Sequence, residues 1–129
     1  MKVLLDTHVW LWCLLADKRL KKTHRALIED HETELFLSPI SLWEAHLLIE
    51  GRRLPVEGDA DRWLRLAMQA LPVREARFTF AVAQRSRSLQ LSHSDPADRF
   101  IVATAVELRI PLMTADTNLL KCPDIQCVS

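Results

Sequence analysis

Glycine is scarce in this chain, with only two residues, Gly51 and Gly58, in a sequence of 129. Phosphate-binding loops and dinucleotide-binding turns need several glycines at close, fixed spacing, because the backbone there must approach the ligand closely. The sequence therefore excludes nucleotide-binding proteins that are built on a glycine-rich loop.

Cysteines and long apolar runs are also few. The three cysteines form an odd set without a CxxC pair, and Cys122 and Cys127 flank a proline without other zinc-ligating residues nearby. This pattern favours a protein with reduced thiols in the cytoplasm over a disulfide-bonded or zinc-binding one. No apolar run reaches the roughly 18 residues of a membrane-spanning helix, so we expect no membrane association.

The formal net charge is zero, which argues against binding of nucleic acid through bulk positive charge. Charge is nevertheless uneven along the chain, because residues 52–87 hold eight arginines against four acidic residues, a net charge of +4. The arginine fork suits phosphate groups. The same run also fits an ordinary solvated surface, so it predicts phosphate contact only weakly.

Short apolar segments alternate with segments of helical periodicity. The expected strands are 3–5, 34–38, 71–73, 111–114 and 125–128. The expected helices are 7–15, capped by Thr7, then 20–32, 39–50, 59–70, 77–88 and 96–108, with Ser38-Pro39 and Asp95-Pro96 as helix starts. This order predicts one α/β domain over residues 1–129, with a parallel sheet of four or five short strands between two layers of helices, α/β/α.

Two aspartates follow predicted strands. Asp6 comes directly after the first strand, and Asp116 comes two residues after the strand that contains Leu112. Ligands of open parallel sheets bind beyond the carboxyl ends of the strands, so these side chains belong on one rim. Aspartate is also common in turns and at helix starts, which is the alternative explanation for either residue alone.

Glu44 lies within a predicted helix, and its helical neighbours are Ile40, Leu47 and Leu48. An unpaired charge buried against apolar residues costs several kcal/mol, so the carboxylate either pairs with a cation or donors, or reaches water at the helix boundary. Asp98 falls three residues after the cap Asp95, where an acid also stabilises a helix start. We assign Asp95 to the cap and Asp98 to the chemistry.

If Asp6, Glu44, Asp98 and Asp116 converge, their mutual repulsion must be relieved by protonation or by a cation. Mg²⁺ or Mn²⁺ takes oxygen ligands and leaves room for a substrate phosphate. Such an ion activates water for attack on a phosphodiester. The four acids therefore predict a metal-dependent phosphodiesterase site.

Three stretches of the sequence, LLDTHVWLW, SPISLWEAHLLIEGRRL and HSDPADRFIVATAVELRIPLMTAD, closely resemble the PIN-domain toxins of the VapC type. The resemblance extends over essentially the whole chain. It implies that the acids at positions 6, 44, 98 and 116 form the metal site, although the family varies at the position of Asp116. It also implies cleavage of RNA by a Mg²⁺- or Mn²⁺-dependent endoribonuclease, a small VapB-like antitoxin whose tail covers the acidic site, and a homodimer.

Two other functions remain open on the sequence. Asp6 after a first strand also fits an aspartyl nucleophile for phosphoryl transfer, although a second acid is normally found where this chain has His8. A non-catalytic module that binds RNA or protein is the other.

Other residues near the motifs receive no catalytic role. We assign none to His8, His46 or His93, although His46 could contact substrate. The tryptophans at 10, 12 and 43 could stack on bases, but their spacing with leucines favours packing in the core or against a partner. Thr7 and Thr114 could hold a metal-bound water, with capping as the alternative.

Overall fold

A computed structural model describes residues 1–92 and 95–128 of the chain. In this part, five strands form one all-parallel sheet in the order β3-β2-β1-β4-β5. The strands are β1 (Lys2–Leu5), β2 (Glu34–Leu37), β3 (Arg74–Glu75), β4 (Leu112–Met113) and β5 (Cys127–Val128). The prediction of a parallel sheet of four or five short strands is confirmed.

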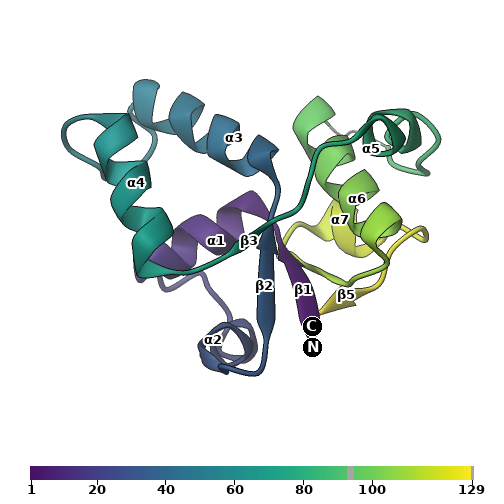
Figure 1. The fold of residues 1–129 in the computed structure, drawn as a ribbon, viewed down its shortest axis with the longest axis horizontal. Coiled ribbons are helices and arrows are strands. Elements are labelled where there is room, and N and C mark those ends of the chain that lie inside the picture. Colours follow the sequence, from purple (N-terminus) through teal and green to yellow (C-terminus); the bar gives the residue numbers. More distant parts are fainter. Residues whose placement is uncertain (93–94, 129) are drawn as a thin grey trace.

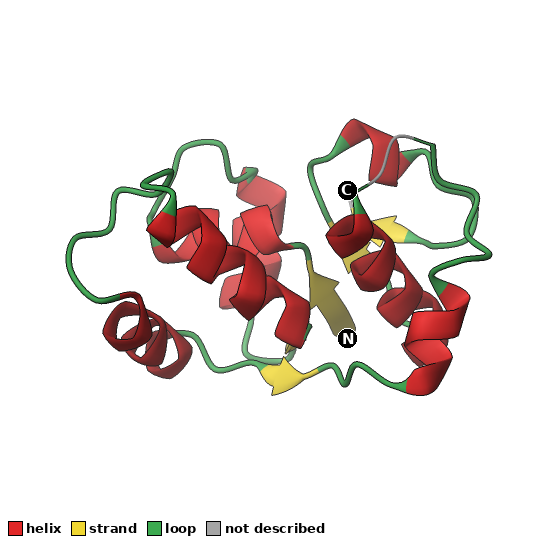
Figure 2. Cartoon of the chain, turned by 90° about the horizontal axis from the view of Figure 1, so that it is seen from above, coloured by secondary structure: helices red, strands yellow, loops and turns green. Residues whose placement is uncertain are grey.

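Helices cover both faces of the sheet (Figures 1 and 2). They are α1 (Thr7–Leu14), α2 (Lys22–Glu29), α3 (Pro39–Glu50), α4 (Ala60–Ala70), α5 (Phe80–Arg85), α6 (Pro96–Leu108) and α7 (Thr117–Leu120). Side chains alternate between the faces of a strand, so β1 contributes to two cores. Val3 and Leu5 pack with α1 to α4, whereas Leu4 packs with α5 to α7. The three-layer α/β/α arrangement is therefore confirmed.

The helix starts at Ser38 and Asp95 form as expected. The Ser38 hydroxyl accepts a hydrogen bond from the Ile40 amide at 3.0 Å, and the Asp95 carboxylate accepts one from the Asp98 amide at 2.8 Å. Proline occupies the first turn of both α3 and α6, where its missing N–H costs nothing. The first helix differs, because Asp6 and not Thr7 is the residue that caps it.

Several predicted boundaries were wrong for local reasons. The helix predicted over 20–32 ends at Glu29, since the Asp30 carboxylate accepts a hydrogen bond from the Glu32 amide and forms a turn. The strand predicted over 71–73 lies instead at Arg74–Glu75, beyond Pro72, which has no N–H to donate to a neighbouring strand. The helix predicted over 77–88 begins only at Phe80, where the Thr79 hydroxyl caps it.

Several large apolar side chains of the helices do not face the core. On α3 the buried side chains are Ser41, Ala45 and Ile49, whereas Trp43 and Leu47 are 55% and 47% exposed. Leu66 of α4 and Leu108 of α6 are exposed as well. Two of the three buried positions of α3 are therefore small residues, while Trp43 and Leu47 face outward.

The order of the strands determines where a ligand can bind. The chain moves from β1 through β2 to β3 on one side, and returns to add β4 and β5 on the other side of β1. In open parallel sheets, a crevice forms beyond the carboxyl ends of the strands at such a reversal. The expected crevice therefore lies between the ends of β1 and β4. His93 and Ser94 of the HSDPADRF motif are outside the described residues.

Within residues 1–92 and 95–128, no helix combines the length and the apolar character needed to cross a lipid bilayer.

Candidate active site

Asp6 lies at the carboxyl end of β1 and starts α1. Its backbone amide donates to the Met113 carbonyl of β4 at 3.0 Å, which fixes it at the reversal of the sheet. The side chain is buried, and it accepts hydrogen bonds from the Thr7 amide at 2.9 Å and from the Thr114 hydroxyl at 2.7 Å. Burial raises the pKa of this carboxyl, and these two hydrogen bonds oppose the rise. Asp6 is thus an immobilised acid with both oxygens engaged.

Thr114, the residue after β4, joins Asp6 to Asp116. Its hydroxyl donates to Asp6 and accepts a hydrogen bond from the Asp116 amide at 3.0 Å. The Asp116 carboxylate caps α7 by accepting hydrogen bonds from the Asn118 and Leu119 amides, and the residue is exposed. Asp116 therefore stands on the same rim as Asp6, as the sequence predicted, and it also performs the structural role of a cap.

Glu44 reaches the same region from the middle of α3. Its Oε1 accepts a hydrogen bond from the Thr7 hydroxyl at 2.5 Å, and the Ser41 hydroxyl lies 2.8 Å from that of Thr7. Since the Thr7 proton points to Glu44, Ser41 is the donor to Thr7. Burial raises the pKa of Glu44, the Thr7 hydrogen bond opposes this, and the charges of Asp6 and Asp95 add to the rise. Sequence analysis overlooked Ser41, because a serine in a helix carries no pattern of its own.

Asp98 occupies the first turn of α6, with its backbone amide held by Asp95. No described residue donates a hydrogen bond to its carboxylate. Burial raises the pKa of Asp98 to about 7, and the negative charges of Asp95, Asp6, Glu44 and Asp116 all contribute. The structure therefore brings the four predicted acids into one electrostatic group, and Asp95 belongs to that group although it was predicted only as a cap.

A divalent cation would relieve this repulsion. Among residues 1–92 and 95–128, however, no three carboxylate, imidazole or thiol side chains are arranged to hold one ion. The donor set fits Mg²⁺ or Mn²⁺ by chemistry, because it consists of carboxylate oxygens, the ligands that these ions prefer. Mg²⁺ keeps several of its waters and commonly takes one or two protein carboxylates directly, so a closed cage is not required.

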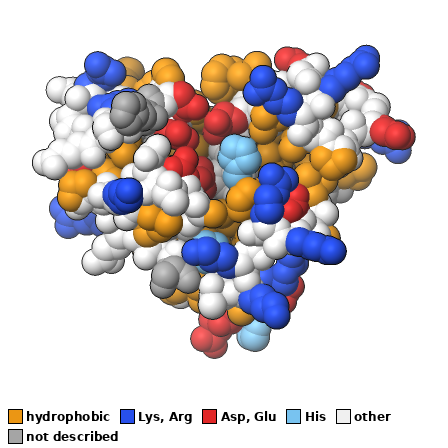
Figure 3. Space-filling model, turned by 180° about the vertical axis from the view of Figure 1, so that it is seen from behind, with side chains coloured by type: hydrophobic (Ala, Val, Ile, Leu, Met, Phe, Trp, Pro, Cys, Tyr) orange, Lys and Arg blue, Asp and Glu red, His pale blue; other side chains and the backbone are white. Residues whose placement is uncertain are grey.

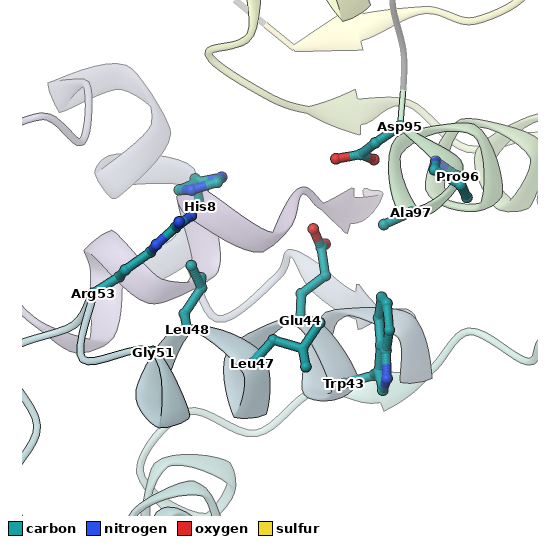
Figure 4. Close-up of a pocket in the computed structure, with 10 residues that line it drawn as sticks. All are labelled: His8, Trp43, Glu44, Leu47, Leu48, Gly51, Arg53, Asp95, Pro96 and Ala97. Carbon is teal, nitrogen blue, oxygen red and sulfur yellow. The ribbon is translucent and has the colours of Figure 1, made fainter.

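Glu44 and Asp95 line an open cavity of about 570 Å³ between α1, α3 and the start of α6, whereas Asp6, Asp98 and Asp116 are not among its lining residues (Figure 4). The carboxylates of Glu44 and Asp95 both point into the space between α3 and α6, with His8 on the opposite side. Trp43 and Leu47 form part of the apolar wall. From the outside, acidic side chains gather in a hollow of this face, with a histidine beside them and Lys and Arg side chains around the margin (Figure 3).

Residues 3–124 match the sequence profile of the PIN domain. The chain belongs to the PIN-domain family. This PIN domain is 37% identical over 118 residues to Ribonuclease VapC22 of Mycobacterium tuberculosis. The aligned region covers 91% of this chain and 88% of the relative. That relationship places it among the VapC proteins, as the sequence motifs predicted.

Solved structures share the fold of this PIN domain. VapBC2 of Rickettsia felis, bound to a DNA fragment from its promoter, aligns with a TM-score of 0.71 at 13% identity, covering 99% of this chain and 98% of that one. The structure of FitAcB from Neisseria gonorrhoeae has a TM-score of 0.66 at 22% identity, covering 98% of this chain and 96% of that one. A toxin–antitoxin complex from Klebsiella pneumoniae has a TM-score of 0.66 at 18% identity, also covering 98% and 96%.

Proposed function

We propose that this PIN domain is a metal-dependent endoribonuclease and the toxin of a toxin–antitoxin pair. The observation that carries the proposal is that Asp6, Glu44 and Asp116 lie close enough to Asp98 for their charges to add to the effect of burial, which raises the pKa of Asp98 to about 7. A relative with 37% identity carries the name ribonuclease, which supports RNA as the substrate.

The acids and the neighbouring hydroxyls would have different roles. Asp6 and Asp98, with Glu44 and Asp116, would hold Mg²⁺ or Mn²⁺. When bound, such an ion lowers the pKa of a water for attack on phosphorus and offsets the charge on the leaving oxygen. Thr7 keeps Glu44 in place, and Thr114 keeps Asp6 in place, so neither acid has to reorganise when substrate arrives.

A small antitoxin partner, a homodimer and a cytoplasmic location belong to the same proposal. The structural neighbours include VapBC2 and a toxin–antitoxin complex, which supports a protein partner. The three cysteines are unpaired, as expected in a reducing compartment.

An aspartyl nucleophile is disfavoured by the surroundings of Asp6. The side chain is only 6% exposed, and its two oxygens accept hydrogen bonds from Thr7 and Thr114. Each oxygen keeps a second lone pair that can reach a small cation, but in-line attack on phosphorus requires a bulky phosphate group to approach this buried side chain. The non-catalytic alternative is decided by the experiment below.

The test uses the purified chain, free of partners, with structured RNAs in Mg²⁺, in Mn²⁺ and in excess EDTA. We expect cleavage with either metal and none with EDTA. Asp6→Asn and Asp98→Asn should each remove cleavage, whereas Glu57→Gln, an exposed acid in the α3–α4 connection, should keep it. Cleavage that persists in EDTA, or in both aspartate variants, would contradict the proposed site, and labelled phosphate on Asp6 would support the nucleophile instead.

A further inference from the structure

Arg53 stands apart from the other arginines of the basic segment. It lines the cavity beside Glu44 and Asp95, and its side chain reaches toward His8 (Figure 4). Its backbone amide donates to the Leu48 carbonyl at 2.8 Å, which ties the residue to the end of α3. Arg74 and Arg85, in contrast, pair with Glu34 and Glu107 on other parts of the surface.

The Arg53 guanidinium is exposed and has no carboxylate partner in the described part of the chain. The nearby acids do not neutralise it by direct contact, although it lines the same cavity. An exposed arginine next to an acidic phosphodiesterase site is well placed to bind a phosphate oxygen through its fork. Its position therefore indicates an anionic ligand that enters the cavity from this side.

A second cavity, of about 260 Å³, continues from the first. His8, Leu48 and Arg53 line both cavities, and Trp12 and Arg19 line the second. The two hollows therefore form one groove, which starts at the acids and runs along α1. In the rest of this section, "the α1 groove" means the part lined by His8, Arg53, Trp12 and Arg19.

The far part of the α1 groove is built from flat side chains. The Arg19 guanidinium lies over the Trp12 ring at 5.1 Å, and the His8 ring is 6.0 Å from that of Trp12. Asp17 holds Arg19 in this position with an ion pair at 2.8 Å. The His8 ring is tilted by 55° to that of Trp12, so these two rings are not stacked on each other. Aromatic rings, and arginines through cation–π contacts, bind nucleic acid bases with little dependence on sequence.

We propose that the α1 groove binds the single-stranded RNA on one side of the scissile bond, with Arg53 on a phosphate and the Trp12–Arg19 pair against a base. The proposal rests on the proposed function, and it assigns the substrate subsite that the four acids leave undefined. A peptide tail could also enter this groove, but an unpaired cation followed by flat stacking surfaces suits a nucleotide chain better. Trp43 lies on the other side of Glu44 from Arg53, whereas Leu47 lies between Glu44 and Arg53 along α3 (Figure 4).

The test measures binding of a fluorescein-labelled, mixed-sequence single-stranded RNA to the full chain carrying Asp98→Asn, in EDTA so that no cleavage occurs. Arg53→Ala and Arg53→Glu are added to this background, and Arg62→Glu, an exposed arginine of α4 that lines neither cavity, is the matched control. We expect Arg53→Ala to weaken binding about fivefold and Arg53→Glu to weaken it more. Loss of one phosphate contact should also lower the slope of log affinity against log salt by about 0.7.

Trp12→Leu tests the stacking surface, and it keeps an apolar side chain because Trp12 also packs on the core. We expect about fivefold weaker RNA binding with an unchanged salt slope. Thermal unfolding checks that each variant is folded. If Trp12→Leu does not fold, the surface variant Arg53→Glu still tests whether the α1 groove binds RNA. In the nuclease-active chain, Arg53→Ala should raise KM more than it lowers kcat.

The outcomes separate the two proposals. Unchanged RNA affinity in both Arg53 variants, or an equal loss in Arg62→Glu, overturns the α1 groove as the RNA site and leaves the groove to a protein partner. No binding of RNA by the Asp98→Asn chain overturns it too. If binding falls as expected but the wild-type chain shows no metal-dependent cleavage, the proposed function fails and the RNA site stands.

Discussion

The two aspartates at the centre of the site have opposite environments. Asp6, at the end of β1, is buried and receives hydrogen bonds on both oxygens. Asp98, at the start of α6, has a carboxylate with no hydrogen-bond donor among the described residues, and its pKa is raised to about 7. The Asp6 side of the site is thus fixed before any ligand binds. On the Asp98 side, the ionised carboxylate is unfavourable until a cation binds. The affinity of the site for a metal ion should therefore depend mainly on Asp98, and the position of the bound ion should depend mainly on Asp6.

The largest expected effect separates these two roles. Asp6→Asn and Asp98→Asn should each lower the rate of RNA cleavage by about 100-fold or more, since each removes a charge that would hold the metal. Their effects on the metal-free fold should differ in sign. Asp98→Asn removes repulsion and should raise the melting temperature at pH 8, whereas Asp6→Asn disturbs a satisfied network and should lower it. Equal shifts of the melting temperature in the same direction would contradict the comparison.

Thr114→Val tests the fixed side. The substitution removes the donor to Asp6 and the acceptor of the Asp116 amide with little change in shape, so it should cost about 1–3 kcal/mol of unfolding free energy. We expect cleavage to fall about tenfold, because Asp6 loses its orientation. Thr104→Val is the matched control, since Thr104 is equally buried in α6 and its hydroxyl donates to the Phe100 carbonyl. The control should keep full activity; a similar loss of activity there would make the effect one of general stability.

The pH dependence of stability tests the Asp98 side. Because the pKa of Asp98 is higher in the folded chain than the ordinary value of 3.8, the folded state binds more protons between these pH values. The free energy of unfolding of the metal-free chain should therefore fall as the pH rises from 4 to 7, by about 1–2 kcal/mol after allowance for the partial exposure of the group. Urea titrations at several pH values, in EDTA, measure this. Asp98→Asn should make the curve less steep, with the remaining slope from Asp6 and Glu44, whose pKa values are also raised by burial. An equally steep curve in that variant would assign the effect to those two acids.

Ser41→Ala should have the smallest effect. It removes the hydrogen bond to the Thr7 hydroxyl, at 2.8 Å, but leaves the bond from Thr7 to Glu44 in place. We expect a loss of about 1 kcal/mol in the free energy of unfolding and a decrease of about two- to threefold in the cleavage rate. Denaturant titration and initial rates give both numbers. A loss of activity as large as that of Asp98→Asn would mean that Ser41 acts on the substrate itself.

The sequence predicted the fold well where its local and long-range signals agree. Alternation of short apolar runs with helical periodicity predicted the parallel sheet, and Ser38-Pro39 and Asp95-Pro96 marked helix starts correctly. The failures have physical causes. Small residues such as Ser41 and Ala45 occupy the inner face of α3, and Trp43 is 55% exposed, so of the two expectations for Trp43, packing in the core and packing against a partner, the structure excludes the first. Pro72 displaced β3 beyond the predicted range.

The sequence predicted which acids belong to the site, but not the hydrogen bonds that hold them. Family motifs and strand ends indicated the four acids, and the structure groups them electrostatically, while their role as metal ligands stays a prediction. The hydroxyls of Thr7 and Thr114 were considered for a metal-bound water, yet in the structure they bind Glu44 and Asp6. Such contacts join residues 37 and 108 positions apart in the chain, and no local pattern in the sequence encodes a pairing of that range.

In this site, carboxylate oxygens that carry the negative charge also cap helices. The carboxylates of Asp6, Asp95 and Asp116 each begin a helix, α1, α6 and α7, and each faces or contributes to the acidic region. Any ion that draws on these oxygens competes with backbone amides for them. Binding of an ion should therefore change the hydrogen-exchange rate of the Thr7 amide. The first turn of α1 would then show by its exchange rate whether the site is occupied.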